Sequence, residues 1–249
     1  MKRSLRVADA IVVPSRSLKQ EVLRHEEAVG GKHSVPLESR IHVLHPGVNR
    51  RYVDPPKASE VEDLFVAHPF LEEEYLLVQG GASTVGGGLE TLLDAYRNGL
   101  SHTELPPLVV LLSDVDASKN LVEAVAQRGL EERVFMLENL EREFLPALYR
   151  GAEFLLYPGL SGNFGTAVLE AAAAGVPSIV GPDCGVLEVV WRGLLVPSAF
   201  EPSHWGEAIA RLHSSADERG DRAAQVRAEA IKSDWASVAQ AHWEIYGAG

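Results

Sequence analysis

The chain has 249 residues, of which 46% are hydrophobic, and its formal net charge at pH 7 is −12. This composition is typical of a globular protein, and the negative charge argues against nucleic acids and anionic membrane surfaces as partners. We find no apolar run near the roughly 18 residues of a transmembrane helix, and no signal peptide is expected at the amino terminus. The single cysteine, Cys184, rules out an internal disulfide and favours a reducing, cytoplasmic location.

The first 55 residues are predicted to contain a strand, a helix and a second strand. An apolar run marks the first strand at 8–15, Ser17 caps a helix that continues to His25, and residues 40–49 form the second strand. The two prolines at positions 55 and 56 are typical of a linker. We therefore interpret residues 1–55 as a short strand-helix unit followed by a linker.

From Tyr75 onward, apolar strands alternate with helices, which indicates a parallel sheet with helices on both faces. Six strands are predicted, at 75–79, 108–114, 134–137, 154–157, 178–181 and 193–197. The predicted helices between them include 89–100, 118–128 and 140–151, the last with an internal proline that suggests a bend. The fold class is therefore α/β, with a single Rossmann-like domain over residues 56–230.

The tail of the chain, from 201 to 246, is predicted to be helical. Apolar residues recur there at helical spacing in two groups: Trp205, Ile209 and Leu212, then Trp235, Val238, Ala239 and Trp243. We interpret residues 231–249 as a separate last helix.

Residues 152–181 contain the most informative pattern in the chain: strand, glycine-broken turn, alanine-rich helix from Thr166 to Ala174, and strand. Such a turn lies at the carboxyl end of the first strand, where open α/β sheets bind ligands. The free amides of the first helical turn favour anionic or hydroxyl-rich groups. Glu170 is a carboxylate in a helix that is otherwise nearly all apolar, so ligand hydroxyls are candidate partners for it.

This segment resembles the signature of the group 1 (family 4) retaining glycosyltransferases, which have the GT-B architecture. The residues in register with that signature are Pro158, Phe164, Gly165, Leu169, Glu170, Ala171, Gly175 and Pro177. The resemblance implies that Glu170 holds the ribose of a nucleotide-activated sugar and that Phe164, Gly165 and Thr166 form the turn beneath the sugar. It also implies the carboxyl-terminal, donor-binding half of such an enzyme, with 1–55 as a remnant of the amino-terminal domain and 231–249 as the helix that crosses back to it.

Three charged positions of the family pattern are glycines in this chain. The glutamate that holds the sugar corresponds to Gly162, and the arginine and lysine that bind the donor diphosphate correspond to Gly81 and Gly87. Each charge-assisted hydrogen bond that is lost costs roughly 1.5–3 kcal/mol. Donor binding is therefore expected to weaken by several orders of magnitude unless other groups replace these charges.

Main-chain amides are the replacement that the sequence offers. The segment from Gly80 to Gly88 is rich in glycine and contains Ser83, so its amides could cradle a phosphate, although a flexible surface loop explains the same composition. Asn163 could hydrogen-bond a sugar, but a simple tight turn also accounts for Gly162 and Asn163.

The remaining polar candidates have structural interpretations. Glu188 matches a glutamate that is common in the family after the fifth strand, and we interpret it as structural. His42 and His45 lack a partner at metal-ligand spacing, and Cys184 lacks an evident base. Neither a metal site nor a nucleophile–base pair is predicted.

We therefore predict the donor-side half of a hexosyltransferase-like enzyme that binds a UDP-, GDP- or ADP-sugar for transfer with retention. No metal, other cofactor or catalytic residue is assigned. The acceptor domain would come from a partner chain or a second copy, and the chain alone would be inactive. Two alternatives are left open: a non-catalytic interaction or scaffold protein that has lost donor binding, and a nucleotide-binding regulator that transfers no sugar.

Overall fold

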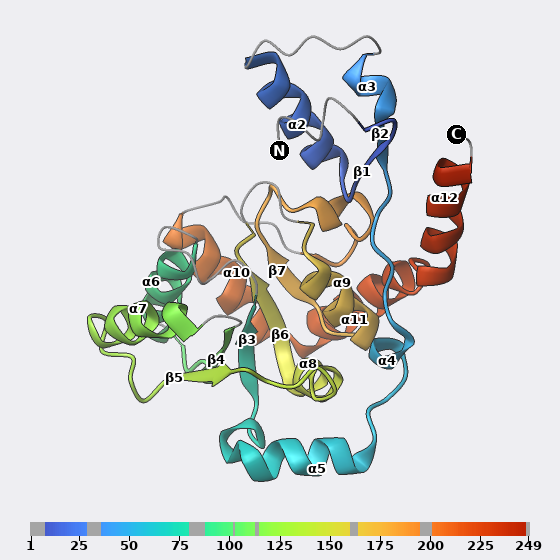
Figure 1. Cartoon of the computed structure of the whole chain (residues 1–249). Coiled ribbons are helices and arrows are strands. Elements are labelled where there is room, and N and C mark those ends of the chain that lie inside the picture. The colour runs from blue at the N-terminus through green and yellow to red at the C-terminus, as the bar shows by residue number, and fades with distance from the viewer. Residues whose placement is uncertain are drawn as a thin grey trace.

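The computed structural model describes residues 8–28, 36–79, 88–101, 103–112, 115–159, 164–194 and 201–247. Its body is a five-stranded parallel sheet in the order β5-β4-β3-β6-β7, with helices on both faces (Figure 1). The strands are β3 (Tyr75–Val78), β4 (Leu108–Leu112), β5 (Val134–Glu138), β6 (Ala152–Tyr157) and β7 (Ser178–Val180). The predicted α/β class with a parallel sheet is confirmed.

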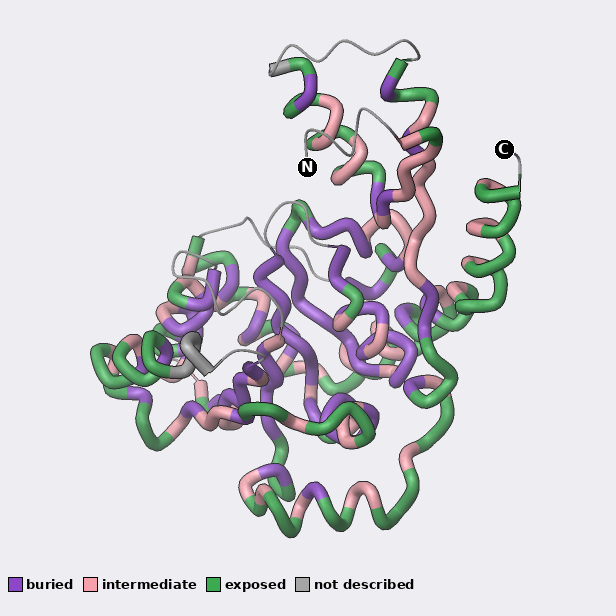
Figure 2. The backbone as a smooth tube through the Cα atoms, viewed as in Figure 1, coloured by how far each residue is buried: buried purple, intermediate pink, exposed green. Residues whose placement is uncertain are grey.

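The strands are apolar throughout because both faces of the sheet are buried. In β3, Tyr75 and Leu77 belong to the hydrophobic core on one face, and Leu76 and Val78 belong to the core on the other face. All four side chains are fully shielded from solvent. Successive residues of a strand point to opposite faces, so a continuous apolar run is the sequence pattern of such a strand. Figure 2 shows the buried centre surrounded by partly exposed helices.

Each face of the sheet is covered by its own set of helices. One core is closed by α6 (Leu89–Leu100), α7 (Val115–Ala126) and α10 (Pro202–Ser214). The other is closed by α8 (Leu145–Gly151), α9 (Thr166–Ala174) and α11 (Ala216–Ala230). The first group of apolar residues in the tail confirms its predicted spacing, because Trp205, Ile209 and Leu212 are all buried and α10 packs on α6.

Several predicted elements differ from the structure: the strands expected at 8–15 and 40–49 are shorter, at Ile11–Val13 and Ile41–Val43. The helix expected at 140–151 begins only at Leu145, so Pro146 lies in its first turn, where a proline costs little. No bend is therefore needed to accommodate it. For the expected sixth strand at 193–197, Gly193 and Leu194 are not in a strand, and the other three positions lie outside the described residues.

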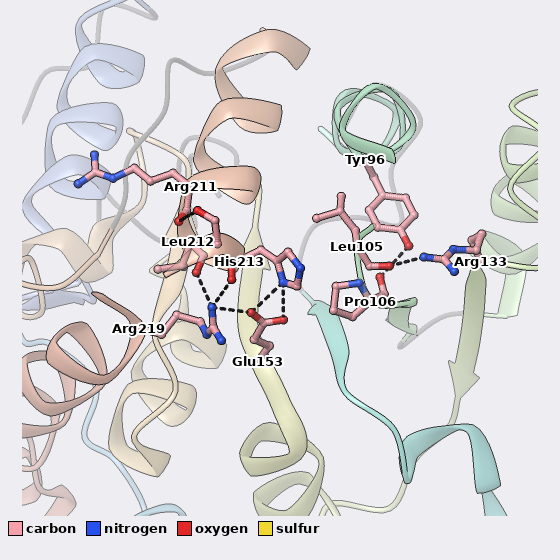
Figure 3. A network of polar contacts seen from close by, with 10 residues as sticks. Tyr96, Leu105, Pro106, Arg133, Glu153, Arg211, Leu212, His213 and Arg219 are labelled. Carbon is pink, nitrogen blue, oxygen red and sulfur yellow. Dashed lines mark hydrogen bonds and ion pairs between the residues drawn. The ribbon is translucent and has the colours of Figure 1, made fainter. Parts of the chain in front are cut away.

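A polar network at the amino end of β6 connects this strand to α10 and α11 (Figure 3). The Glu153 side chain is only 4% exposed, and its carboxylate accepts a hydrogen bond from His213 Nδ1 at 3.0 Å. Arg219 Nη1 lies 2.9 Å from the same carboxylate. A buried carboxylate is costly unless it is paired, so these contacts stabilise the packing of α10 and α11 on β6.

A small unit stands above the body in Figure 1. It consists of β1 (Ile11–Val13) and β2 (Ile41–Val43), which pair in parallel, with α2 (Arg16–Ala28) and α3 (Leu37–Arg40). Its small core contains Val13, Leu37 and Ile41. The chain then passes through α4 (Arg50–Val53), α5 (Ala58–Ala67) and the 3-10 turn η1 (Pro69–Leu71) into β3.

Glu188 joins the small unit to the body. It lies in the 3-10 turn η2 (Gly185–Glu188), and its carboxylate accepts hydrogen bonds from Arg16 N at 2.9 Å and Ser17 N at 3.1 Å. These amides belong to the first turn of α2 and have no hydrogen-bond acceptor within the helix. The carboxylate therefore caps α2, which is a structural role of the kind expected for this residue.

The last helix, α12 (Trp235–Gly247), extends away from the body at the right of Figure 1. Its start is fixed by a hydrogen bond from Val48 N to Ser233 O at 2.6 Å. The predicted helix is present. Its apolar face is largely exposed, since Trp235 is 49% exposed and Trp243 is 73% exposed. No helix in the described part of the chain is long and apolar enough to cross a membrane.

Candidate functional site

The order of the strands places a crevice at the carboxyl end of the sheet. From β3 the chain proceeds to β4 and β5 on one side, and then crosses to β6 and β7 on the other. In open parallel sheets, ligands bind where the direction of the crossovers reverses, outside the carboxyl ends of the strands. Here that point lies between the ends of β3 and β6.

A cleft of about 910 Å³ lies at this edge. Its volume is within the range of roughly 300–1,000 Å³ that is typical of small-molecule sites. The lining residues come from α4 and the residue before it, from the ends of three strands, from the segment that leads into α8, from α8 and α9, and from the start of α12: Asn49, Arg51, Tyr52, Gln79, Leu111, Leu112, Asn139, Leu140, Arg142, Leu145, Thr166, Glu170 and Trp235.

The turn before α9 is shaped by a glycine. Gly165 has φ 88°, which is in the left-handed region, and a Cβ at this position would collide with Cys184 Sγ. Cys184 is buried and donates a weak hydrogen bond to Phe164 O at 3.2 Å. Burial raises the pKa of Cys184 to about 11, so its side chain is a neutral thiol at pH 7 that packs against the turn.

Only two of the predicted site residues that the structure describes line the cleft. Thr166 is exposed in the first turn of α9, and Glu170 is one turn further along the same helix. Phe164 and Gly165 are buried behind the turn, where Phe164 stacks on His45 at a ring distance of 6.0 Å. The other predicted residues, Gly80, Gly81, Ser83, Gly87, Gly162 and Asn163, lie outside the described residues.

Two tyrosines face the carboxylate of Glu170. Tyr149 Oη lies 3.1 Å from Glu170 Oε2 and 2.6 Å from Gln79 Oε1. A phenol has one proton, so it can donate to only one of these oxygens at a time. Tyr52 also hydrogen-bonds the carboxylate, and its ring lies 5.8 Å from that of Tyr149. Glu170 is therefore held from one side by phenols while its helix faces the cleft.

Burial sets the protonation of this cluster. It raises the pKa of Glu170 above 4.5, while the two tyrosines and the charges of Arg142 and Arg51 act in the opposite direction. Burial and the charge of Glu170 raise the pKa values of Tyr149 and Tyr52. Both phenols therefore remain protonated donors at neutral pH, and the side-chain oxygens of Glu170 accept from them.

Backbone contacts hold α4 against the body. Arg150 Nη2 donates to Tyr52 O and Val53 O, each at 3.0 Å, and Arg227 Nη2 donates to Val53 O at 2.9 Å. The side chain of Asn49 caps the amino end of α4 by accepting from Arg51 N at 3.0 Å. Together these contacts place Arg51 and Tyr52 in the wall of the cleft.

Several cleft residues were missed by the sequence interpretation. Gln79 and Asn139 are polar residues directly after β3 and β5, which is a usable signal, and Asn139 has an unusual positive φ of 53°. No local pattern marks Arg51, Tyr52 or Arg142. In the described part of the chain, no group of three or more His, Cys, Asp or Glu side chains is arranged to hold a metal ion.

Comparisons with known proteins identify the family. The profile of the family Glycosyl transferases group 1 matches residues 60–232. A D-inositol 3-phosphate glycosyltransferase of Xylanimonas cellulosilytica is 27% identical over 96% of this chain, which covers 57% of that relative. The chain thus spans little more than half the length of the relative that it matches.

Solved structures share the fold of this chain. The structure of HepE from Anabaena in complex with UDP and glucose has a TM-score of 0.80 at 17% identity and covers all of this chain, which corresponds to 65% of HepE. Sucrose-phosphate synthase from Thermosynechococcus elongatus has a TM-score of 0.74 at 19% identity, with 100% of this chain and 61% of that one covered. The chain therefore belongs to the group 1 glycosyl transferases, and its fold is that of one half of a GT-B enzyme.

Proposed function

We propose that this chain is the donor-binding side of a glycosyltransferase and binds a nucleotide-activated sugar in the cleft at the carboxyl end of its sheet. The observation that carries the proposal is the placement of Glu170. This carboxylate lies in a cleft of about 910 Å³ at the carboxyl end of the sheet, and the phenol of Tyr149 hydrogen-bonds it. HepE, which shares the fold, is described in complex with UDP and glucose.

Each described residue has a distinct role in this proposal. Glu170 accepts hydrogen bonds from the two ribose hydroxyls, which suits a carboxylate with two acceptor oxygens. Thr166, in the first turn of α9, lines the cleft, and the free amides of such a helix start favour the negative charge of the donor. Gln79 lies beside Tyr149 and limits how that phenol can reorient.

Transfer with retention is inferred from the signature that the chain shares with the retaining glycosyltransferases. The acceptor side is proposed to come from a partner chain that carries an acceptor domain or from a second copy of this chain. The aromatic residues of α12 are exposed, which supports a contact between this helix and a partner chain or second copy.

Titration with nucleotides tests donor binding. UDP, GDP and ADP are added separately at up to millimolar concentration, and binding is followed by calorimetry and by the melting temperature. We expect at least one of them to raise the melting temperature, because a ligand that binds only the folded state stabilises it. Glu170→Gln should weaken that binding about tenfold or more, since it removes charge-assisted hydrogen bonds.

The matched control is Glu207→Gln, which removes an exposed carboxylate on α10 outside the cleft and should leave the affinity unchanged. If none of the three nucleotides binds, the donor-binding proposal is wrong, and a non-catalytic interaction protein becomes the better interpretation. If a nucleotide binds equally well to both variants, the ligand does not use Glu170.

A further inference from the structure

The charges that line the cleft differ from those of the whole chain. The protein has a net charge of −12, yet the charged residues that line the cleft within the described part of the chain are two arginines, Arg51 and Arg142, and one carboxylate, Glu170. This part of the surface is therefore locally positive when Glu170 is ionised. A cleft with walls of low dielectric constant concentrates such a field and attracts anions.

The two arginines reach the cleft from segments that are far apart in the sequence. Arg51 lies in α4, and its Nη1 is 3.5 Å from the backbone oxygen of Arg142, which precedes α8. Both guanidinium groups act electrostatically on Glu170 and on Tyr52, which places their charges around the same buried cluster.

These guanidinium groups are available for a ligand. Among the described residues, neither forms an ion pair with a carboxylate, whereas the adjacent Arg50 lies 3.9 Å from Asp54. Both arginines are exposed and line the cleft, and the contact that a bound anion would compete with is the long hydrogen bond from Arg51 Nη1 to Arg142 O at 3.5 Å. A guanidinium presents a planar fork of donors that matches the oxygens of a phosphate.

We propose that Arg51 and Arg142 bind the diphosphate of the nucleotide from the side of the cleft formed by α4 and α8. This inference rests on the proposed function, because it assumes a nucleotide beside Glu170. It also provides cations that the family pattern places elsewhere. Where that pattern has an arginine and a lysine for the diphosphate, this chain has Gly81 and Gly87. In this proposal, Arg51 and Arg142 supply the cationic contacts instead.

The test compares ligands that differ only in their phosphates. For whichever of UDP, GDP or ADP binds the protein, affinities are measured for the diphosphate, the monophosphate and the nucleoside. Arg51→Gln and Arg142→Gln should each weaken diphosphate binding about tenfold, and together about a hundredfold, while nucleoside binding changes less than twofold. Arg51→Lys should recover part of the loss, because it keeps the charge without the fork.

Arg50→Gln is the matched control, because it removes an arginine from the same short helix that does not line the cleft. It should leave all three affinities unchanged. If the diphosphate binds and depends on Glu170 but not on Arg51 or Arg142, this inference is wrong and the proposed function stands. Equal losses for nucleoside and diphosphate would also overturn it, since the arginines would then only support the shape of the site. If no nucleotide binds at all, both proposals fail.

Discussion

At the residue scale, the site depends on how Glu170 is kept in place. A carboxylate in an apolar helix is costly to bury, and burial accordingly raises its pKa. Tyr149 and Tyr52 offset that cost by hydrogen-bonding the carboxylate, and their own raised pKa values keep both phenols protonated. Glu170 is thus fixed in orientation by neutral donors, and oxygen lone pairs remain for ligand hydroxyls.

The raised pKa of Glu170 makes nucleotide binding dependent on pH. An ionised carboxylate is the stronger acceptor for ribose hydroxyls, so affinity should rise with pH as Glu170 loses its proton and level off above its pKa. The measurement is the dissociation constant between about pH 5 and 8 for the wild type and for Glu170→Gln. The ratio of the two constants cancels the titration of the nucleotide phosphates. A ratio that does not change with pH would contradict the assignment of Glu170.

The same pKa shift predicts the sign of a stability effect. Between about 4.5 and the raised value, the folded protein retains a proton that the unfolded chain has lost. The free energy of unfolding contributed by Glu170 therefore falls as pH rises through this window. The measurement is the free energy of unfolding of the wild type and of Glu170→Gln, from chemical denaturation over that pH range. The wild type should lose stability relative to the variant as pH rises. Parallel pH profiles would mean that folding does not shift the pKa of Glu170.

At the scale of elements, the start of α9 determines where Thr166 and Glu170 lie. The left-handed Gly165 turns the chain from the end of β6 into the helix, and Cys184 and Val186 fill the space behind it. The helix ends at Gly175, which is also left-handed at φ 82°. The two glycines have similar backbone conformations but different surroundings. Comparing an alanine substitution at each therefore distinguishes the cost of backbone strain from the cost of steric overlap.

Gly165→Ala should lower the free energy of unfolding by about 2 kcal/mol or more, because a Cβ meets Cys184 Sγ in addition to the backbone strain. Gly175→Ala is the matched control. The nearest atom to a Cβ at this position would be Arg227 Cδ at 3.7 Å, so only the strain of about 1 kcal/mol is expected. Urea denaturation gives both values. Equal losses for the two variants would show that the packing behind Gly165 can relax.

At the scale of the whole molecule, two parts extend from the body. The small unit of β1, β2, α2 and α3 is joined to it by the carboxylate of Glu188, which caps α2. The helix α12 begins beside Val48 and presents Trp243 and Tyr246, which are 73% and 66% exposed. Exposed aromatic residues of this size on a long helix face mark a surface that is normally covered.

We expect this chain to self-associate when no partner is present, with the aromatic face of α12 at the contact. Sedimentation velocity over a range of concentrations should show a species larger than a monomer. Replacing Trp243 and Tyr246 together by serine should restore the monomer, because it removes the exposed apolar area. Trp191→Ser is the control, since Trp191 is 60% exposed but lies beside Arg192 on the body. A monomer at every concentration contradicts the prediction.

Much of the fold was determined by local sequence patterns. The apolar runs of β3, β4 and β6 predicted buried parallel strands, because only such strands lack a polar face. The segment from Phe164 to Pro177 predicted a turn, a helix from Thr166 to Ala174 and the position of Glu170, and the structure has the helix with the same bounds. These features depend on neighbouring residues, so the sequence carries them directly.

The walls of the cleft were decided only by the tertiary structure. Arg51 and Arg142 are 91 positions apart, and Gln79 and Tyr149 are 70 apart, yet each pair meets beside Glu170. Such contacts depend on the order of the strands and on the packing of α4 against α9, and neither leaves a local pattern. Sequence alone therefore located the helix that carries the central carboxylate. The folded chain decided which phenols hold it and which cations surround it, because those groups converge only when distant segments pack together.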